Sequence, residues 1–219
     1  MTRSVASARQ PISNLVKNYN FENAPPFTAA QTSGVNRWID GSAGGLVSDT
    51  AYPYGWGTIT ITNGVSIKYD TSVYYSGTTS MKLSTTATNS AVAVASSKGT
   101  SVSDGVLTGI PVTPSTSYTL SFMMKTNYVS GDATSGAYVD LSERTGGYVT
   151  VLNTSSTKVK TTTDWTRYSI TVTTGATTRF IMPLLRVIGN DGTATLIMDA
   201  WFDDIVLTPT TPITRTAVT

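Results

Sequence analysis

Carboxylates stand near both ends of the chain, within segments that have the pattern of β-strands. The segment NLVKNYNFE, residues 14–22, ends in Glu22, which is one of two glutamates in the sequence. The segment WFDDIVL, residues 201–207, contains Asp203 and Asp204. We expect these two segments to meet in the folded protein. Carboxylates brought together in this way repel one another and raise each other's pKa unless a cation lies between them.

The composition excludes several classes of chemistry and of partner. The chain has no Cys and no His, so it has no disulfides, no thiolate chemistry, no histidine triad and none of the usual zinc ligands. Charged residues make up 13% of the chain and its net charge is +2. The basic residues are scattered, so we expect no nucleic-acid partner. No apolar run approaches the roughly 20 residues of a membrane helix, so we expect no membrane insertion.

The sequence pattern predicts β-structure throughout. Thr, Ser, Gly, Val and Tyr are abundant, and Thr in particular suits a half-exposed pleated surface. In residues 117–125, Tyr118, Leu120 and Phe122 fall on one face, as expected of a strand with one buried side. Residues 180–187 are apolar on both faces, and Pro183 within them indicates an edge, a bulge or a break. We expect strands at residues 14–22, 56–62, 66–69, 80–84, 91–96, 106–112, 117–125, 137–141, 148–152, 165–173, 179–187, 194–198 and 201–207.

These short strands, separated by turns rich in Gly, Asn, Asp and Ser, predict an all-β fold, a jelly-roll β-sandwich of two antiparallel sheets. The sandwich should cover residues 14–208. Residues 1–13 are expected to form an N-terminal extended arm and residues 209–219 a C-terminal extended tail, because both are polar and unpatterned. Such arms could engage a second copy of the chain, in a homo-oligomer, or neighbours in a virion or surface assembly.

Several motifs, taken in order, resemble the jelly-roll carbohydrate-binding modules of the CBM4/9/22 type. The opening NLVKNYNFE resembles N-L-x-x-N-G-x-F-E, with Tyr19 where the family usually has Gly. A tyrosine there would be strained if the backbone needs a positive φ. The closing AWFDDIVLTP resembles the F-x-D-D-V-x-L strand. Between them, SGTTSMKLS, SYTLSFMMKT and DWTRYSITVT resemble G-x-x-S-L-K-L, Y-T-L-S-F-x-x-K and W-x-x-Y-x-x-x-F.

The resemblance implies a structural Ca²⁺ ion, which such modules often carry. Its ligands would be Glu22, one of Asp203 and Asp204, and backbone carbonyls near Asn20 and Lys82. Ca²⁺ accepts carboxylate and carbonyl oxygens in flexible geometry. The alternative is that these acids are solvated strand ends or partners of Lys82.

The resemblance also implies a glycan-binding face or edge. Sugars present C–H faces to aromatic rings and hydroxyls to polar side chains. Tyr138, Asp140 and Ser142 share one strand face, which Arg144 continues if the strand extends that far. Trp56 and Trp165 stand at strand starts and favour core or edge packing instead. The candidate ligand-binding residues are Trp38, Tyr54, Tyr128, Tyr138, Asp140, Arg144 and Tyr148.

Two functions follow from these observations. The first is a non-catalytic module that captures a polysaccharide or a cell-surface glycan, in an extracellular or virion-surface location, although the first residues, MTRSVASARQPIS, lack the apolar region of a signal peptide. The alternative is a structural protein of a virion, such as a capsid decoration or a tail component. We expect no enzymatic activity, because no second pair of carboxylates stands out for glycoside hydrolysis. A lyase that uses Tyr with Lys or Arg is left open.

Overall fold

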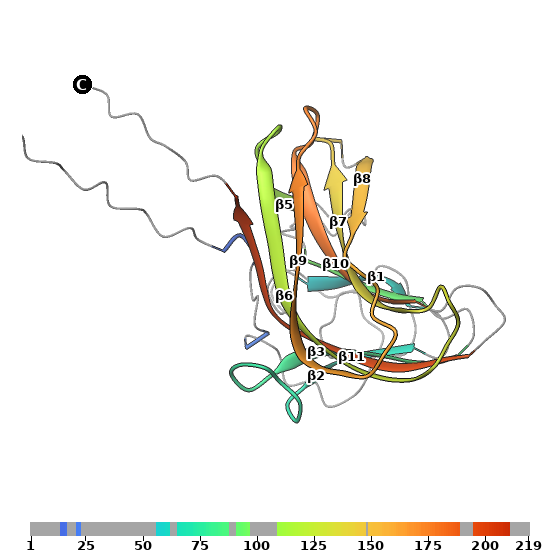
Figure 1. The fold of residues 1–219 in the computed structure, drawn as a ribbon. Helices are drawn as coiled ribbons and strands as arrows, with labels where there is room; N and C mark the ends of the chain where they lie inside the picture. Colours follow the sequence, from blue (N-terminus) through green and yellow to red (C-terminus); the bar gives the residue numbers. More distant parts are fainter. Residues whose placement is uncertain are drawn as a thin grey trace, which may run out of the picture.

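The computed structural model describes residues 14–16, 21–22, 56–61, 65–87, 91–96, 109–147, 149–188 and 195–210. Within these ranges the regular structure consists of strands in two antiparallel sheets (Figure 1). The strands are β1 (Trp56–Ile61), β2 (Val65–Asp70), β3 (Ser80–Ala87), β4 (Ala91–Ser96), β5 (Ile110–Pro111), β6 (Ser117–Ser130), β7 (Gly136–Arg144), β8 (Thr150–Ser155), β9 (Thr163–Thr173), β10 (Phe180–Ile188) and β11 (Leu196–Pro209).

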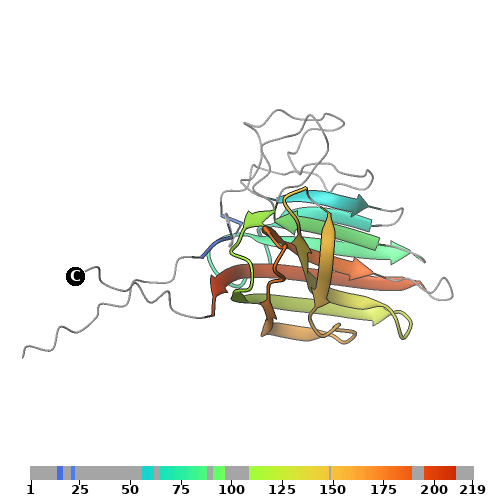
Figure 2. The same cartoon turned by 90° about the horizontal axis from the view of Figure 1, so that it is seen from above.

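The strands divide between a six-stranded and a five-stranded sheet. The six-stranded sheet has the order β1-β4-β10-β7-β8, with β5 paired to β10, and the five-stranded sheet has the order β2-β3-β11-β6-β9. In the second sheet β3, β11 and β6 lie side by side (Figure 2). The predicted all-β jelly-roll sandwich is therefore confirmed. No helix in the described part of the chain has the length and apolarity needed to cross a membrane.

Three of the predicted strands need correction. Residues 194–198 and 201–207 were expected to be separate, but one strand, β11, runs from Leu196 to Pro209. A register shift between Asp203 and Val206, with Asp204 at a φ of 46°, bends this strand without ending it. Residues 14–16 and 21–22 are not in strand conformation. The remainder of that expected strand, with Tyr19 and Asn20, lies outside the described residues.

Pro183 lies in β10, which is not an edge strand. It pairs with Leu141 of β7 on one side. On the other side, β5 pairs with β10 at Phe180 and Ile181, and β4 pairs with it from Leu184 onward. Among the described strands, none pairs with β10 at Pro183 on that side. A residue without an N–H is tolerated at such a local gap between two partners.

The core is formed by the inward-facing residues of both sheets. In β6 the alternation predicted from the sequence is confirmed, because Tyr118, Leu120 and Phe122 are buried. Phe21 and Trp56 are completely buried and their ring centroids lie 5.2 Å apart. Burying a side chain as large as Phe contributes about 2 kcal/mol. The Phe21 contact therefore fixes the N-terminal segment to the sandwich.

The segment at Asn14 and the end of β11 lie side by side, as the sequence predicted. The Asn14 amide nitrogen donates to the Ile205 carbonyl at 2.9 Å, and the Asn14 amide oxygen accepts from the Leu207 N–H at 3.0 Å. The Leu15 N–H also donates to the Leu207 carbonyl at 3.0 Å. Asn14 thus satisfies backbone groups next to the bulge in β11, which would otherwise lack partners.

Candidate functional site

The candidate site is a row of polar and aromatic side chains on the outer face of the six-stranded sheet. Successive residues of a strand point to opposite faces. In β7, Ala137, Val139 and Leu141 belong to the core. Tyr138 and Asp140 therefore lie on the outer face, together with Ser142 and Arg144.

A carboxylate–guanidinium pair occupies the centre of this row. Arg186 is opposite Tyr138 in the register of β10 and β7, and Leu184 is opposite Asp140. One Asp140 oxygen lies 2.7 Å from Arg186 Nε, and the other accepts a hydrogen bond from the Ser155 hydroxyl at 2.5 Å. Both oxygens are therefore held by neighbours from different strands. Asp140 is buried, so removing either partner would leave a poorly solvated charge without its counter-ion.

Tyr138 places an aromatic ring beside this pair. The ring is half-buried, and the Lys158 ammonium lies 5.0 Å from its centroid. Lys158 also donates a hydrogen bond to the Thr134 carbonyl. Burial raises the pKa of the Tyr138 hydroxyl, although the Arg186 guanidinium opposes this effect. The hydroxyl therefore stays protonated at neutral pH and is able to donate a hydrogen bond.

The outer face is open only in part. Ser142, Met182 and Leu184 point outward beside Asp140, yet they are buried. Tyr138, Arg186 and Lys158 keep part of their surface exposed, as does Arg144 at the far end of β7. A ligand on this face would therefore contact the end that contains Tyr138 and Arg186.

The other predicted ligand-binding residues do not join this row. Tyr128 lies in β6 of the five-stranded sheet, opposite Met198, and packs against the core. Trp38, Tyr54 and Tyr148 lie outside the described residues. Three residues that complete the row were missed from the sequence: Arg186, Ser155 and Lys158. Arg186 carried a usable signal, because it is the one charged residue in the strand FIMPLLRVI.

The acids predicted to share a metal ion hold one loop, residues 71–79. Asp203 accepts the Tyr75 and Ser76 N–H groups at 2.9 and 3.0 Å. Glu22 accepts the Thr78 and Thr79 N–H groups at 2.8 and 3.0 Å. We call these contacts the loop clamp.

Burial and the loop clamp act in opposite directions on the pKa of both acids. Burial disfavours the charged form of Glu22, but hydrogen bonds from Thr78 and Thr79 outweigh burial and lower its pKa. Burial raises the pKa of Asp203 to about 6, although backbone N–H groups act in the opposite direction. The pKa values of the two acids therefore shift in opposite directions, because Asp203 is fully buried and Glu22 is not.

The carboxylates predicted to bind calcium already accept hydrogen bonds from the described residues. Both oxygens of Asp203 accept backbone N–H groups, the second from Asp204 at 2.8 Å, and both oxygens of Glu22 accept hydrogen bonds from the loop. These donors occupy part of the acceptor capacity that a cation would use. Within the described ranges, no three acidic side chains converge on one point. Asn20 lies outside those ranges, so the calcium ion stays a prediction.

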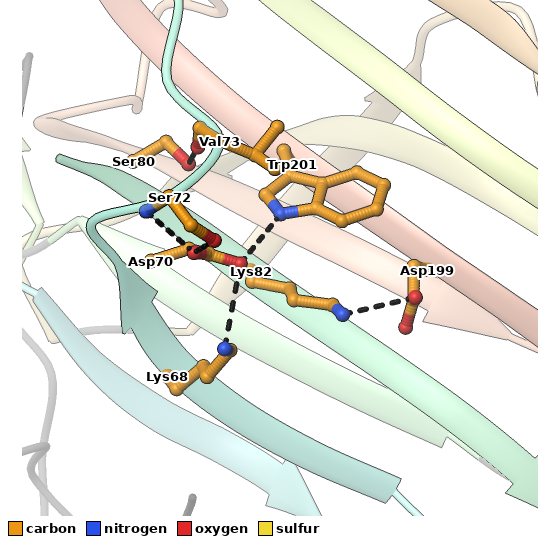
Figure 3. Close-up of polar contacts among 8 residues, drawn as sticks. All are labelled: Lys68, Asp70, Ser72, Val73, Ser80, Lys82, Asp199 and Trp201. Atoms are coloured by element: carbon orange, nitrogen blue, oxygen red, sulfur yellow. Dashed lines mark hydrogen bonds and ion pairs between the residues drawn. The ribbon is translucent and has the colours of Figure 1, made fainter. Parts of the chain in front are cut away.

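Lys82 belongs to a different cluster, on the outer face of the five-stranded sheet (Figure 3). Its ammonium pairs with Asp199 at 2.9 Å and lies 4.7 Å from the centroid of the Trp201 ring. The alternative interpretation, in which Lys82 is a partner of Glu22, Asp203 or Asp204, is therefore wrong. The lysine stem and charge cover the indole, which is almost fully buried.

Asp70 holds the other side of the Trp201 indole (Figure 3). The indole N–H donates to one Asp70 oxygen at 2.9 Å, and Ser72 donates to the other through its N–H and its hydroxyl. Lys68 lies 3.4 Å from the same carboxylate. Burial opposes ionisation, but these hydrogen bonds and the Lys68 charge lower the pKa of Asp70 well below its usual value. The cluster ties β2 to β11 across β3.

Comparison with solved structures finds the same fold in proteins of different activities. The enzymatically active domain of tailspike protein 4 from bacteriophage CBA120 is similar over 71% of this chain and 19% of that chain, with 11% identity and a TM-score of 0.52. The Stig cyclase Fisc from Fischerella sp. TAU is similar over 90% of this chain and 97% of that chain, with 14% identity and a TM-score of 0.51. The CBM22-1 xylan-binding domain of Paenibacillus barcinonensis Xyn10C is similar over 83% of this chain and 97% of that chain, with 14% identity and a TM-score of 0.44.

The chain has the two-sheet β-sandwich fold that the family resemblance predicted, and carbohydrate-binding modules are among the proteins of similar structure. The similar part is about a fifth of the length of that tailspike domain. No protein-family model matches the chain, and no curated protein matches it either. Because the identities are low, the similarity establishes the fold alone.

Proposed function

We propose that the protein is a non-catalytic glycan-binding domain, and that the glycan contacts the exposed end of the outer face of the six-stranded sheet. The observation that carries this proposal is the Asp140–Arg186 pair beside the Tyr138 ring. A half-exposed ring offers a stacking surface for the C–H face of a sugar. Polar groups that are already fixed can exchange hydrogen bonds with its hydroxyls. The polysaccharide or cell-surface glycan would then be met outside a cell or on a virion surface.

Preorganisation supports this role. Asp140 is held by both Arg186 and Ser155, and Lys158 is held by the Thr134 carbonyl. These side chains lose little freedom when a ligand binds, so less of the interaction energy is lost to ordering. We therefore expect weak but specific binding that depends on ring orientation.

A binding role also agrees with the distribution of carboxylates. Among the described residues of this outer face, Asp140 is the lone carboxylate. Glycoside hydrolysis needs two carboxyl groups on either side of the bond that is cleaved. Glu143 lies on the same strand but points to the opposite side, where it accepts hydrogen bonds from Gly175 and Thr178.

Polysaccharide binding tests the proposal directly. We expect retention of the wild-type chain on at least one of xylan, galactan and cellulose, and about tenfold weaker binding for Tyr138→Ala, since losing one stacked ring costs about 1.4 kcal/mol. Lys158→Ala should also weaken binding. Lys160→Ala is the matched control, because Lys160 bonds the neighbouring Ala133 carbonyl and does not cover Tyr138.

Two results would overturn the proposal. Unchanged binding of a folded Tyr138→Ala variant would remove the site from this face. Failure of the wild type to bind these polysaccharides and a panel of cell-surface glycans would remove the function itself. Circular dichroism should establish that each variant is folded.

A structural role in an assembly is the second candidate, and the edge strand β8 favours it. Val149, Val151 and Leu152 are 65, 42 and 54% exposed. Within the described residues, β8 is hydrogen-bonded to β7 alone. An uncharged apolar edge is a template for pairing with another strand. If this role holds, the solution mass should exceed one chain, and Leu152→Lys should reduce it to one. A monomeric wild type would exclude this candidate.

A further inference from the structure

We propose a second glycan-binding site on the outer face of the five-stranded sheet, formed by Tyr75 and Trp165. The two ring centroids lie 5.9 Å apart, and the ring planes make an angle of 59°. Tyr75 is 49% exposed and its neighbour Tyr74 is 43% exposed. Trp165, which was expected in core or edge packing, lies in the edge strand β9 and keeps part of its surface exposed. The pair therefore presents a tilted aromatic surface to solvent.

The loop that carries Tyr75 is fixed along its length. Ser72 donates to Asp70 near its start, and the Val73 carbonyl accepts a hydrogen bond from the Ser80 hydroxyl at 2.6 Å. The loop clamp, formed by Asp203 and Glu22, holds its second half. A ring on a fixed loop binds with a smaller loss of conformational entropy than a ring on a free one.

The position of Tyr75 follows from these contacts. Its N–H is bonded to Asp203 of β11, while its ring contacts Trp165 of the edge strand β9. The strand β6 lies between β11 and β9. The Tyr75 side chain must therefore extend across the outer face of β6, and this places its ring on the sheet surface instead of on a free loop tip.

The charges around the pair point to a neutral ligand. Lys125 is paired with Asp164 at 2.7 Å, next to Trp165. Farther across the same sheet, Lys68 and Lys82 are paired with Asp70 and Asp199. Arg167, whose described contact is the neutral Ser121 hydroxyl, is then the main cation near the rings, and a single cation gives little attraction for phosphate groups. Aromatic rings with fixed polar neighbours are instead suited to the uncharged pyranose rings of a polysaccharide.

The Asp164 and Arg167 side chains would supply the polar contacts. Asp164 is 83% exposed, so a sugar hydroxyl could reach it. The Arg167 guanidinium donates to the Ser121 hydroxyl at 3.0 Å and is oriented on the sheet surface by this bond. The class of ligand assigned to this second site rests on the proposed function. Its residues lie on the other sheet from those of the first site.

Titration with soluble xylohexaose, cellohexaose and β-1,4-galactotetraose tests the second site. Saturation-transfer NMR reports which sugar binds, and calorimetry gives the number of sites. We expect two sites on the wild type for the bound sugar, and one site on Trp165→Ala and on Tyr75→Ala. Thr171→Ala is the matched control, because Thr171 is exposed on the same strand but bonds Thr119 and no ring.

A further variant tests the role of the loop clamp. Gly77 has a φ of +66°, and a Cβ there would lie 2.2 Å from Glu22 Oε1. Gly77→Ala should therefore displace the loop and weaken binding at the second site, although both aromatic residues, Tyr75 and Trp165, are unchanged.

The outcomes separate the two proposals. Binding that is lost in Trp165→Ala but unchanged in Tyr138→Ala would leave the second site standing and overturn the first. Binding lost in Tyr138→Ala alone, with one site on the wild type, would overturn the second site. If none of the three oligosaccharides binds, the second site is also overturned. If Trp165→Ala fails to fold, Tyr75→Ala decides the question, because Tyr75 is largely exposed.

Discussion

The two outer faces of the sandwich present polar and aromatic groups in different ways. On the six-stranded sheet, Asp140 and Arg186 are strand residues that hold one another directly, and Tyr138 lies beside them in the same register. On the five-stranded sheet, the exposed ring of Tyr75 belongs to a loop, and carboxylates of β11 and of the N-terminal segment hold that loop through its backbone. The polar groups beside the Tyr138 ring thus depend on pairing between side chains, whereas the position of the Tyr75 ring depends on pairing between side chains and backbone.

This difference predicts how much stability each face loses when a carboxylate is removed. Loss of a strand carboxylate on the six-stranded sheet leaves a cation unpaired. Loss of a carboxylate beneath the loop leaves neutral N–H groups without acceptors. An unpaired buried charge costs more than an unpaired neutral donor.

Removing Asp140 should have the largest effect. Asp140→Ala leaves the Arg186 guanidinium, whose side chain is 24% exposed, without its partner. We expect the free energy of unfolding to fall by about 4 kcal/mol. Urea denaturation measures this change, and Ser155→Ala, which removes one neutral donor to Asp140, should cost about 1 kcal/mol. Equal losses in the two variants would contradict the interpretation of the pair.

The pH dependence of stability should come next, and it reports on Asp203. The pKa of Asp203 is about 6 in the folded protein and 3.8 in the unfolded chain. Its contribution to stability is therefore fully present below pH 3.8 and is lost as the pH rises through about 6. We expect the free energy of unfolding, measured in EDTA, to fall by up to about 3 kcal/mol across this range.

Asp203→Asn serves as the control for this titration, since it cannot ionise and should flatten the dependence. A wild-type profile that is already flat would contradict the prediction. Repeating the series with Ca²⁺ also tests the calcium ion predicted from the sequence, because a bound cation would favour the charged form and stabilise the protein above pH 6. No stabilisation by Ca²⁺ would exclude that ion.

The smallest of these effects is expected at the five-stranded face. Asp70→Ala removes the acceptor of the buried Trp201 indole N–H and of Ser72. We expect a loss of about 2 kcal/mol in urea denaturation. Lys68→Ala should cost less than about 1 kcal/mol, because Lys68 is the exposed partner of Asp70. If the lysine variant were the less stable of the two, the ion pair and not the indole contact would be the important interaction.

Alternation along strands made the fold and part of the site predictable. Because Tyr138, Asp140 and Ser142 are two residues apart, a strand must place them on one face, and the structure confirms this placement. The meeting of Asn14 with β11 was predicted from motifs at the two ends of the chain. Both predictions depend on local pattern or on family resemblance.

The remaining features depend on pairing between distant strands, which local pattern does not contain. Arg186 reaches Asp140 because β10 lies beside β7, and nothing in either segment specifies that neighbour. Asp199 and Ala200 pair with both β3 and β6, so β11 continues through the point where a break between two strands was expected. The acids at the two ends bind loop N–H groups, because the loop between β2 and β3 comes between them.

Asn14 has a consequence for how this domain can be combined with others. Its side chain joins the first described residues to Ile205 and Leu207, and Thr210 remains bonded to Ser117 beside them. A polypeptide that enters the sandwich at residue 14 and leaves it at residue 210 does so at neighbouring points. The domain is therefore suited to insertion within a surface loop of a host protein, which needs little separation between the two junctions.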